Sequence, residues 1–225
     1  ILPEIVPGSW TITAFKGRHK IVIEASCDPA YLLNLVNPTE QGIKPWTWEA
    51  LNGQIRFQLY KKWGLRWFMI ADATASSYYD ISGDGAYVLA GRARLGSIIA
   101  GDLDVVSANR RLFSGGGGSV RGYRERFIGP LDANNDPTGG LSAAEAGIEL
   151  RTRLSSAIGL AGFFEAGTVS EEVFPAFDEG VQMAVGGGVR YFSPIGPLRL
   201  DVGVPINGRD ADDAFQVYIS IGQAF

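Results

Sequence analysis

The feature that most restricts the fold of this chain is a two-residue alternation of apolar and polar side chains along segments of about ten residues. It is clearest from residue 87 onward. Within residues 144–154, for example, alanine, isoleucine and leucine side chains alternate with glutamate, glycine and arginine. The alanine-rich start of this segment is also compatible with a helix, but the length of the alternation favours a strand. Because successive side chains of a strand point to opposite faces of a sheet, each predicted strand has one apolar and one polar face.

The connections between the predicted strands alternate between short turns and long loops. Short turns are expected at residues 82–85, 154–156 and 193–196, and long loops at residues 100–141, 170–179 and 207–213. Short turns at one rim and long loops at the other are typical of an outer-membrane β-barrel, and strands of about ten residues match a tilted membrane crossing. Aromatic residues near the strand ends and charges of both signs on the polar faces also favour a barrel.

A soluble β-sandwich is the alternative fold, because its strands also alternate where one face of each sheet meets water. The strands expected here are longer than the usual length of about five or six residues. We therefore predict an all-β fold, an antiparallel transmembrane β-barrel of the outer-membrane type, with about eight to ten strands in this chain. Residues 49–225 are expected to hold the regular strands and the long loop 100–141. Residues 1–48 are expected to form an N-terminal barrel segment, whose pattern indicates little beyond two short strands near residues 10–15 and 20–25.

Composition argues against several classes of function. The net charge of −4 gives no indication of nucleic-acid binding. His19 and Cys27, the single histidine and the single cysteine, are too few for a metal site or an internal disulfide. No run approaches the roughly 18 apolar residues of a membrane helix, although barrel strands need no such run. Glu145 and Glu149 share one face with arginines, which predicts a salt-bridge network rather than an acid–base pair. We therefore expect no enzyme, no cofactor and no metal.

The long loop contains a glycine run at residues 115–118, followed after one serine by Val120, Arg121, Gly122 and Tyr123. Consecutive glycines let the backbone fold tightly, and the arginine presents its N–H donors at the end of that turn. No Gly-Lys-Ser/Thr closes the run, so a phosphate-binding loop is a poor fit. The alternative is a flexible glycine linker with an exposed arginine.

This loop resembles the glycine-rich Val-Arg-Gly-Tyr loop of the bacterial outer-membrane assembly and secretion barrels, the BamA/TamA or surface-antigen family. In that family the loop folds back into the barrel, and its arginine pairs with an acid on a wall strand of Phe-x-Asp-x-Gly type. The segment 163–167 is similar to that strand, with Phe163 and Gly167 in place and Glu165 instead of aspartate. The resemblance implies that Glu165 anchors the loop through a directional guanidinium–carboxylate pair with Arg121. Alternatively, Glu165 simply neutralises an arginine of the lumen.

Two further sets of residues complete the resemblance. By alternation, Glu165 shares its face with charged side chains that would line the lumen: Arg151, Arg190, Arg199 and Asp201. The chain end resembles the C-terminal signal by which outer-membrane barrels are recognised for assembly, through Phe215, Gly222 and Phe225. The matches cover roughly residues 65–225 and imply the C-terminal half of a barrel. Within the family, the chain is most similar to the translocation-and-assembly (TamA) branch.

The resemblance implies a protein of the bacterial outer membrane that assists the insertion or translocation of other β-rich proteins. A barrel whose first and last strands pair weakly would open laterally and template a client strand by β-augmentation, while the Arg121 loop braces the lumen. The expected partners are outer-membrane lipids, client β-barrel or autotransporter proteins and a periplasm-spanning assembly partner, but no nucleic acid. The alternatives are a passive barrel, pore or surface antigen without assembly activity, and a soluble β-sandwich binding module.

Overall fold

The described part of the chain folds into β-strands joined in one sheet. The computed structural model describes residues 10–14, 20–25, 52–62, 66–100, 103–178, 180–193 and 196–221. Gly222 and Phe225 of the predicted C-terminal signal lie outside these residues, as does most of the segment 1–48. The strands described are β1 (Trp10–Ala14), β2 (Lys20–Ala25), β3 (Asn52–Lys62), β4 (Arg66–Asp80), β5 (Tyr87–Ile99), β6 (Ser142–Arg153), β7 (Ile158–Ser170), β8 (Gln182–Ser193), β9 (Gly196–Pro205) and β10 (Gln216–Ile221).

The long loop between β5 and β6 contains two short 3-10 helices, η2 (Leu103–Val105) and η3 (Ala108–Arg110). In the part of the chain that the structure describes, no helix has both the length and the apolar character needed to cross a membrane.

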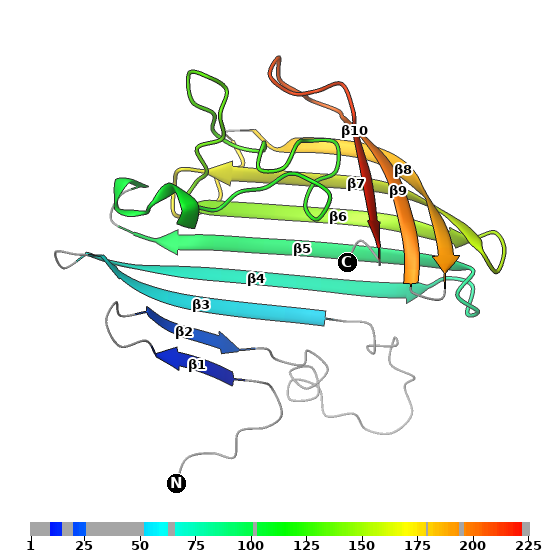
Figure 1. Ribbon diagram of the computed structural model, residues 1–225, viewed down its shortest axis with the longest axis horizontal. Helices are drawn as coiled ribbons and strands as arrows, with labels where there is room; N and C mark the ends of the chain where they lie inside the picture. The colour runs from blue at the N-terminus through cyan, green and yellow to red at the C-terminus, as the bar shows by residue number, and fades with distance from the viewer. Residues whose placement is uncertain are drawn as a thin grey trace, which may run out of the picture.

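The strands follow one another in chain order across the sheet, from β1 at one edge to β10 at the other, and every neighbouring pair is antiparallel. Figure 1 shows the sheet curving, with the long loop (green) lying over its concave face beside β6 and β7. Among the described strands β1 and β10 are not paired with each other, so this part of the chain is an open, partial barrel. The predicted all-β antiparallel fold is confirmed. The helical alternative at the start of β6 is wrong, because Ser142 already pairs with Ser97 and Ser170.

The connections alternate in length as the sequence predicts. In Figure 1 the short turns after β4 and β6 lie at one end of the sheet, where β8 also ends and β9 begins, and the long connections after β5, β7 and β9 lie at the other. The loop that carries the arginine motif is therefore one of the long connections at a single rim.

The two faces of the sheet have opposite character. The outer face presents large apolar side chains, such as Ile148 and Ile219, which are 56% and 81% exposed. The inner face carries buried charged side chains instead, including Glu149, Glu165 and Asp201. Soluble proteins bury most of their large apolar residues and rarely bury charges, whereas a membrane barrel has an apolar band outside and a polar interior. The distribution of side chains therefore fits a membrane barrel and not a soluble sandwich.

The hydrophobic core lies between the long loop and the inner wall. It comprises Val106, Leu112, Val120, Tyr123 and Ile128 of the loop together with Phe68, Ile98, Leu141, Ala143, Val169 and Ala184. Full burial of one large apolar side chain contributes about 1.5–3 kcal/mol. Apolar packing therefore holds the loop against the sheet in addition to its polar contacts.

Candidate functional site: the loop on the inner wall

The glycine run builds a tight turn that places Arg121 against the wall. Gly115 and Gly116 have φ values of 105° and 100°, in the left-handed region that glycine adopts without strain. The N–H of Gly116 donates to the carbonyl oxygen of Tyr123 at 3.1 Å, which closes the turn around the arginine. Arg121 is only 1% exposed. The alternative of a flexible linker with an exposed arginine is therefore wrong for this loop.

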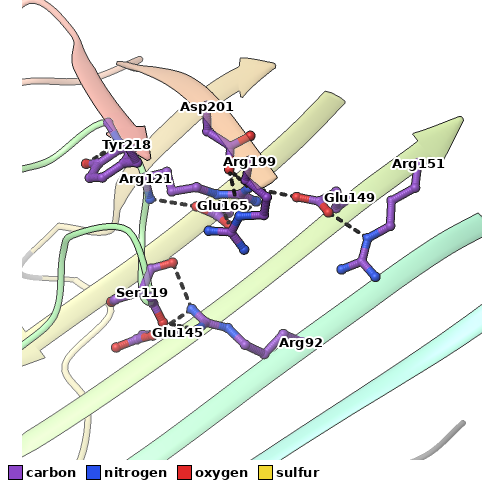
Figure 2. A network of polar contacts seen from close by, with 12 residues as sticks. Arg92, Ser119, Arg121, Glu145, Glu149, Arg151, Glu165, Arg199, Asp201 and Tyr218 are labelled. Atoms are coloured by element: carbon purple, nitrogen blue, oxygen red, sulfur yellow. Dashed lines mark hydrogen bonds and ion pairs between the residues drawn. The ribbon is translucent and has the colours of Figure 1, made fainter. Parts of the chain in front are cut away.

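Arg121 contacts three carboxylates of the wall (Figure 2). Its Nε and Nη2 donate to Oε1 of Glu165 on β7, at 3.0 and 2.6 Å. Its Nη1 donates to Oε2 of Glu149 on β6 at 2.7 Å and to Oδ2 of Asp201 on β9 at 3.1 Å. The other oxygen of Glu165 accepts the backbone N–H of Arg121 at 2.6 Å. Glu165 therefore holds both the side chain and the backbone of the motif arginine.

The predicted luminal charges lie in one network around Arg121. Arg190 pairs with Asp201 and lies 3.3 Å from Glu149. Arg151 donates from Nε to Glu149 Oε1 at 2.7 Å. Arg199 lies on the same wall, with its Nε 3.5 Å from Asp201 Oδ2. The structure thus brings together all four of the luminal residues that the alternation placed on one face.

Burial makes such a network unfavourable unless its charges are paired. Burial alone lowers the pKa of the Arg121 guanidinium. Its hydrogen bonds to Glu165 and the negative charges of Glu165 and Glu149 outweigh burial, and they raise that pKa above the ordinary value for arginine. The guanidinium therefore stays charged, and the loop carries a permanent positive charge into the lumen.

Phe163 and Gly167, the other two residues of the predicted anchoring strand, also contact the motif. The ring of Phe163 lies 3.5 Å, centroid to Cζ, from the guanidinium of Arg121 in a cation–π contact. Gly186 on β8 leaves room for this ring, because a Cβ there would collide with it. A Cβ at Gly167 would lie 2.9 Å from Cγ2 of Val120. Small residues thus line the wall where the loop packs.

Gly122 lets the loop backbone lie directly on β8 and β9. Its φ is 118°, and a Cβ at this position would be 2.7 Å from the Cβ of Ala184. On β9, a Cβ at Gly203 would lie 2.6 Å from the nitrogen of Gly122 and 2.7 Å from the carbonyl carbon of Arg121. The motif glycine therefore depends on a matching glycine in the wall.

Tyr123, the last residue of the motif, is buried against β8. Its hydroxyl lies 3.0 Å from the carbonyl oxygen of Met183 and 3.3 Å from Oδ1 of Asn207. Burial and the negative charge of Asp212 raise the pKa of Tyr123 to about 12. The hydroxyl is therefore neutral at physiological pH and serves as a hydrogen-bond donor to the wall.

Two further contacts of the loop were not predicted from the sequence. The first involves Tyr218 on β10, whose hydroxyl donates to the carbonyl oxygen of Tyr123 at 2.6 Å and accepts the N–H of Gly122 at 3.1 Å. Figure 2 shows Tyr218 beside Arg121. The alternation placed Tyr218 on the polar face of the last strand, but its neighbours in the sequence do not indicate a partner.

The second contact holds the base of the loop to Glu145 on β6. Oε1 of Glu145 accepts from Ser114 Oγ at 2.7 Å and from Arg94 Nη1 at 3.0 Å, and Oε2 accepts from Arg92 Nη2 at 2.9 Å. Arg92 also donates to the carbonyl oxygen of Ser119 at 2.8 Å (Figure 2). The alternation places Arg92, Arg94 and Glu145 on one polar face, which predicts a salt-bridge network. It does not predict that the loop joins this network.

Of the predicted C-terminal signal, the described residues include Phe215 alone. It precedes β10 and is 57% exposed. Within the described residues, no group of three or more histidine, cysteine or acidic side chains is arranged to hold a metal ion.

A sequence model of the Omp85 superfamily domain matches residues 52–225. The chain belongs to the Omp85 superfamily. It is accordingly a protein of the bacterial outer membrane. Over 146 residues, this Omp85 domain is 33% identical to the outer membrane protein assembly factor BamA of Nitratidesulfovibrio vulgaris, and the match covers 62% of the chain and 18% of that protein.

The fold of this Omp85 domain is similar to the crystal structure of BamA from Haemophilus ducreyi lacking POTRA domains 1–3. The TM-score is 0.64 at 19% sequence identity, and the match covers 88% of this chain and 41% of that chain. The chain therefore spans less than half the length of either relative. The predicted BamA-like family is confirmed, whereas the TamA branch within it stays a prediction.

Proposed function

We propose that this chain is the C-terminal part of an outer-membrane barrel that assists the insertion or translocation of other outer-membrane or autotransporter-type proteins. Superfamily membership and similarity to a relative named as an outer-membrane assembly factor support this proposal. Residues 1–48 would add an N-terminal segment to the same barrel. The observation that carries the mechanism is the buried Arg121, held by wall carboxylates in a loop that also contacts the last described strand. No step of this function requires a catalytic group.

The strand at the C-terminal edge supplies the seam in this mechanism. β10 pairs with β9 over residues 216–221, and its other edge has no partner among the described strands. An unpaired edge presents backbone N–H and C=O groups that template an added strand. In the proposed reaction a client strand pairs at this edge, while the Arg121 loop braces the lumen and sets how readily the seam opens.

The proposed partners are outer-membrane lipids, client β-barrel or autotransporter proteins and a periplasm-spanning assembly partner. Lipids contact the apolar outer face, and client strands pair with the edge of β10.

A reconstitution experiment tests the proposed function. The full-length protein is placed in liposomes, an unfolded client barrel is added, and client insertion is followed by protease protection and by resistance of the folded barrel to SDS. Glu165→Gln removes the charge that holds Arg121, and Glu125→Gln makes the same change at an exposed position of the same loop. We expect the Glu165 variant to lose most of the insertion activity and the Glu125 variant to keep it.

Ion conductance measured in the same liposomes separates assembly from a passive barrel or pore. If wild-type liposomes insert no client, and the Glu165 variant changes conductance alone, the protein is a passive barrel and the proposed function is wrong.

A further inference from the structure

The hydroxyl of Tyr218 connects β10, the last described strand, to the Arg121 loop through two hydrogen bonds. Tyr218 projects from the inner face of β10, and its hydroxyl donates to the Tyr123 carbonyl at 2.6 Å and accepts the Gly122 N–H at 3.1 Å. Both partners are backbone groups of the motif, in the two residues that follow Arg121. The tyrosine ring also lies against the glycine run, since a Cβ at Gly117 would be 3.0 Å from the ring carbon Cδ1 of Tyr218.

The two ends of this connection differ in how firmly they are held. The loop end is fixed, because the same turn carries the buried Arg121 with its wall carboxylates and the buried side chain of Val120. The strand end is held weakly, because β10 has a single neighbour among the described strands and pairs with it over six residues. A contact between a fixed and a weakly held element restrains the weak one.

The contacts between the two loops at the rim of the sheet do not replace this restraint. Arg209 and Arg124 join the loop that precedes β10 to the motif loop, through the carbonyl oxygen of Gly129 at 2.6 Å and the carboxylate of Asp213 at 3.2 Å. They lie at the rim, before the strand begins. Among the described residues of β10, Tyr218 is the one whose side chain forms hydrogen bonds with the Arg121 loop.

We propose that Tyr218 is a positioning residue that couples the edge strand β10 to the Arg121 loop, so that the strand and the loop move as one unit. With the hydroxyl bonded, β10 stays in place beside the loop. When the loop shifts, or when the hydroxyl loses its two partners, the edge of β10 is released toward an incoming strand. The coupling stands on the contacts alone, whereas its consequence for client strands rests on the proposed function.

The variant Tyr218→Phe removes the hydroxyl and keeps the ring. Spin labels on cysteines at Val217 and Ile148, both exposed on the outer face of the sheet, report the distance between β10 and β6 in liposomes, in a background without native cysteines. Loss of two hydrogen bonds is expected to raise the population of the displaced strand roughly 5- to 30-fold. Tyr191→Phe is the matched control, because Tyr191 lies exposed on the outer face of β8 and its loss should leave the distances unchanged.

Coupling also predicts a dependence between two variants. Glu165→Gln, which loosens the loop, should displace β10 when Tyr218 is present and add nothing in the Tyr218→Phe background. Additive displacements by the two variants, or a Tyr218→Phe distance distribution equal to that of Tyr191→Phe, would overturn the proposal.

A measurement on the unaltered protein decides the question even if Tyr218→Phe does not fold. The amide of Gly122 should resist hydrogen exchange, because its N–H donates to Tyr218. Exchange of this amide as fast as that of exposed Glu125 overturns the proposal. Client insertion is measured in the same liposomes, so an inactive wild-type protein would count against the proposed function while the distance data still decide the coupling.

Discussion

At the scale of single residues, the site depends on one cation with several anionic partners. Glu165 uses one oxygen for the guanidinium and the other for the backbone N–H of Arg121, so it fixes both the direction and the depth of the loop. Glu149 and Asp201 both accept hydrogen bonds from Nη1 of Arg121, and the ring of Phe163 covers the guanidinium. Only a planar group with several fixed donors satisfies all of these partners together.

Replacing Arg121 by lysine keeps the charge and removes the planar fork. A lysine ammonium is a point charge and leaves some of the buried carboxylates unpaired, so we expect a loss of about 3–5 kcal/mol in the free energy of unfolding. Urea unfolding of the barrel in lipid vesicles measures this change. Arg110→Lys, at an exposed position of the same loop, should stay within about 0.5 kcal/mol of the wild type. Equal stability of the two variants would show that Arg121 does not anchor the loop.

The base of the loop gives a separate prediction at Glu145. Glu145→Gln removes the charge that Arg92 and Arg94 share and weakens the bond from Ser114. Hydrogen exchange should therefore accelerate in residues 112–119 and change little at Arg121, whose own carboxylates remain. Uniform acceleration across the loop would mean that the two anchors are one cooperative unit.

The residue scale also shows what the sequence could and could not predict. The side chains of Arg151, Arg190, Arg199 and Asp201 can be assigned to one face from the sequence, because the two-residue period of a strand fixes the face of every position. The contacts of Tyr218 and Ser114 could not be derived in this way. They depend on the path of an irregular loop, which has no period, and on partners distant in the sequence.

At the scale of elements, the site requires close approach between the loop and β9. Gly203 leaves space that the backbone of Arg121 and Gly122 occupies, and Gly122 leaves space for Ala184 on β8. Ala184 and Gly186 on the inner face of β8 are small, and the alternation in the sequence does not show that the loop and Phe163 pack against them. Shape, in addition to charge, therefore decides where the motif packs.

A single methyl group on β9 should displace the loop. Gly203→Ala would place a Cβ within 2.6 Å of a backbone atom, so the loop must move away from the wall. We expect destabilisation of about 1–3 kcal/mol and faster proteolysis within the loop. Gly162→Ala on β7 is the control, because a Cβ there meets nothing within 4 Å. Wild-type protease resistance of the Gly203 variant would contradict the packing described here.

At the scale of the whole molecule, the sheet separates an apolar outside from a charged inside. Ile148 on β6 is exposed on the outer face, while its neighbour Glu149 is buried on the inner face. The same one-residue step occurs in the neighbouring strand, where Phe164 is outside and Glu165 inside. This arrangement is stable only where lipid covers the outer face and polar groups pair in the lumen.

Ile148→Arg tests the assignment of the outer face. A charge near the middle of a lipid-facing strand should destabilise the barrel in vesicles by about 2–4 kcal/mol. Ile148→Ala controls for the loss of the side chain itself. If the arginine variant is as stable as the alanine variant, the face that carries Ile148 meets water, and the membrane orientation of the sheet is wrong.

The central claim is that the Arg121–Glu165 pair holds the loop in an assembly-competent barrel, and exchange of the two charges tests it most directly. Client insertion by the full-length protein in liposomes is measured for Arg121→Glu, for Glu165→Arg and for the two substitutions together. The account predicts that each single reversal loses most of the insertion activity, and that the double exchange recovers part of it because an opposite-charge pair forms again. Insertion at the wild-type rate by both single variants would contradict the claim.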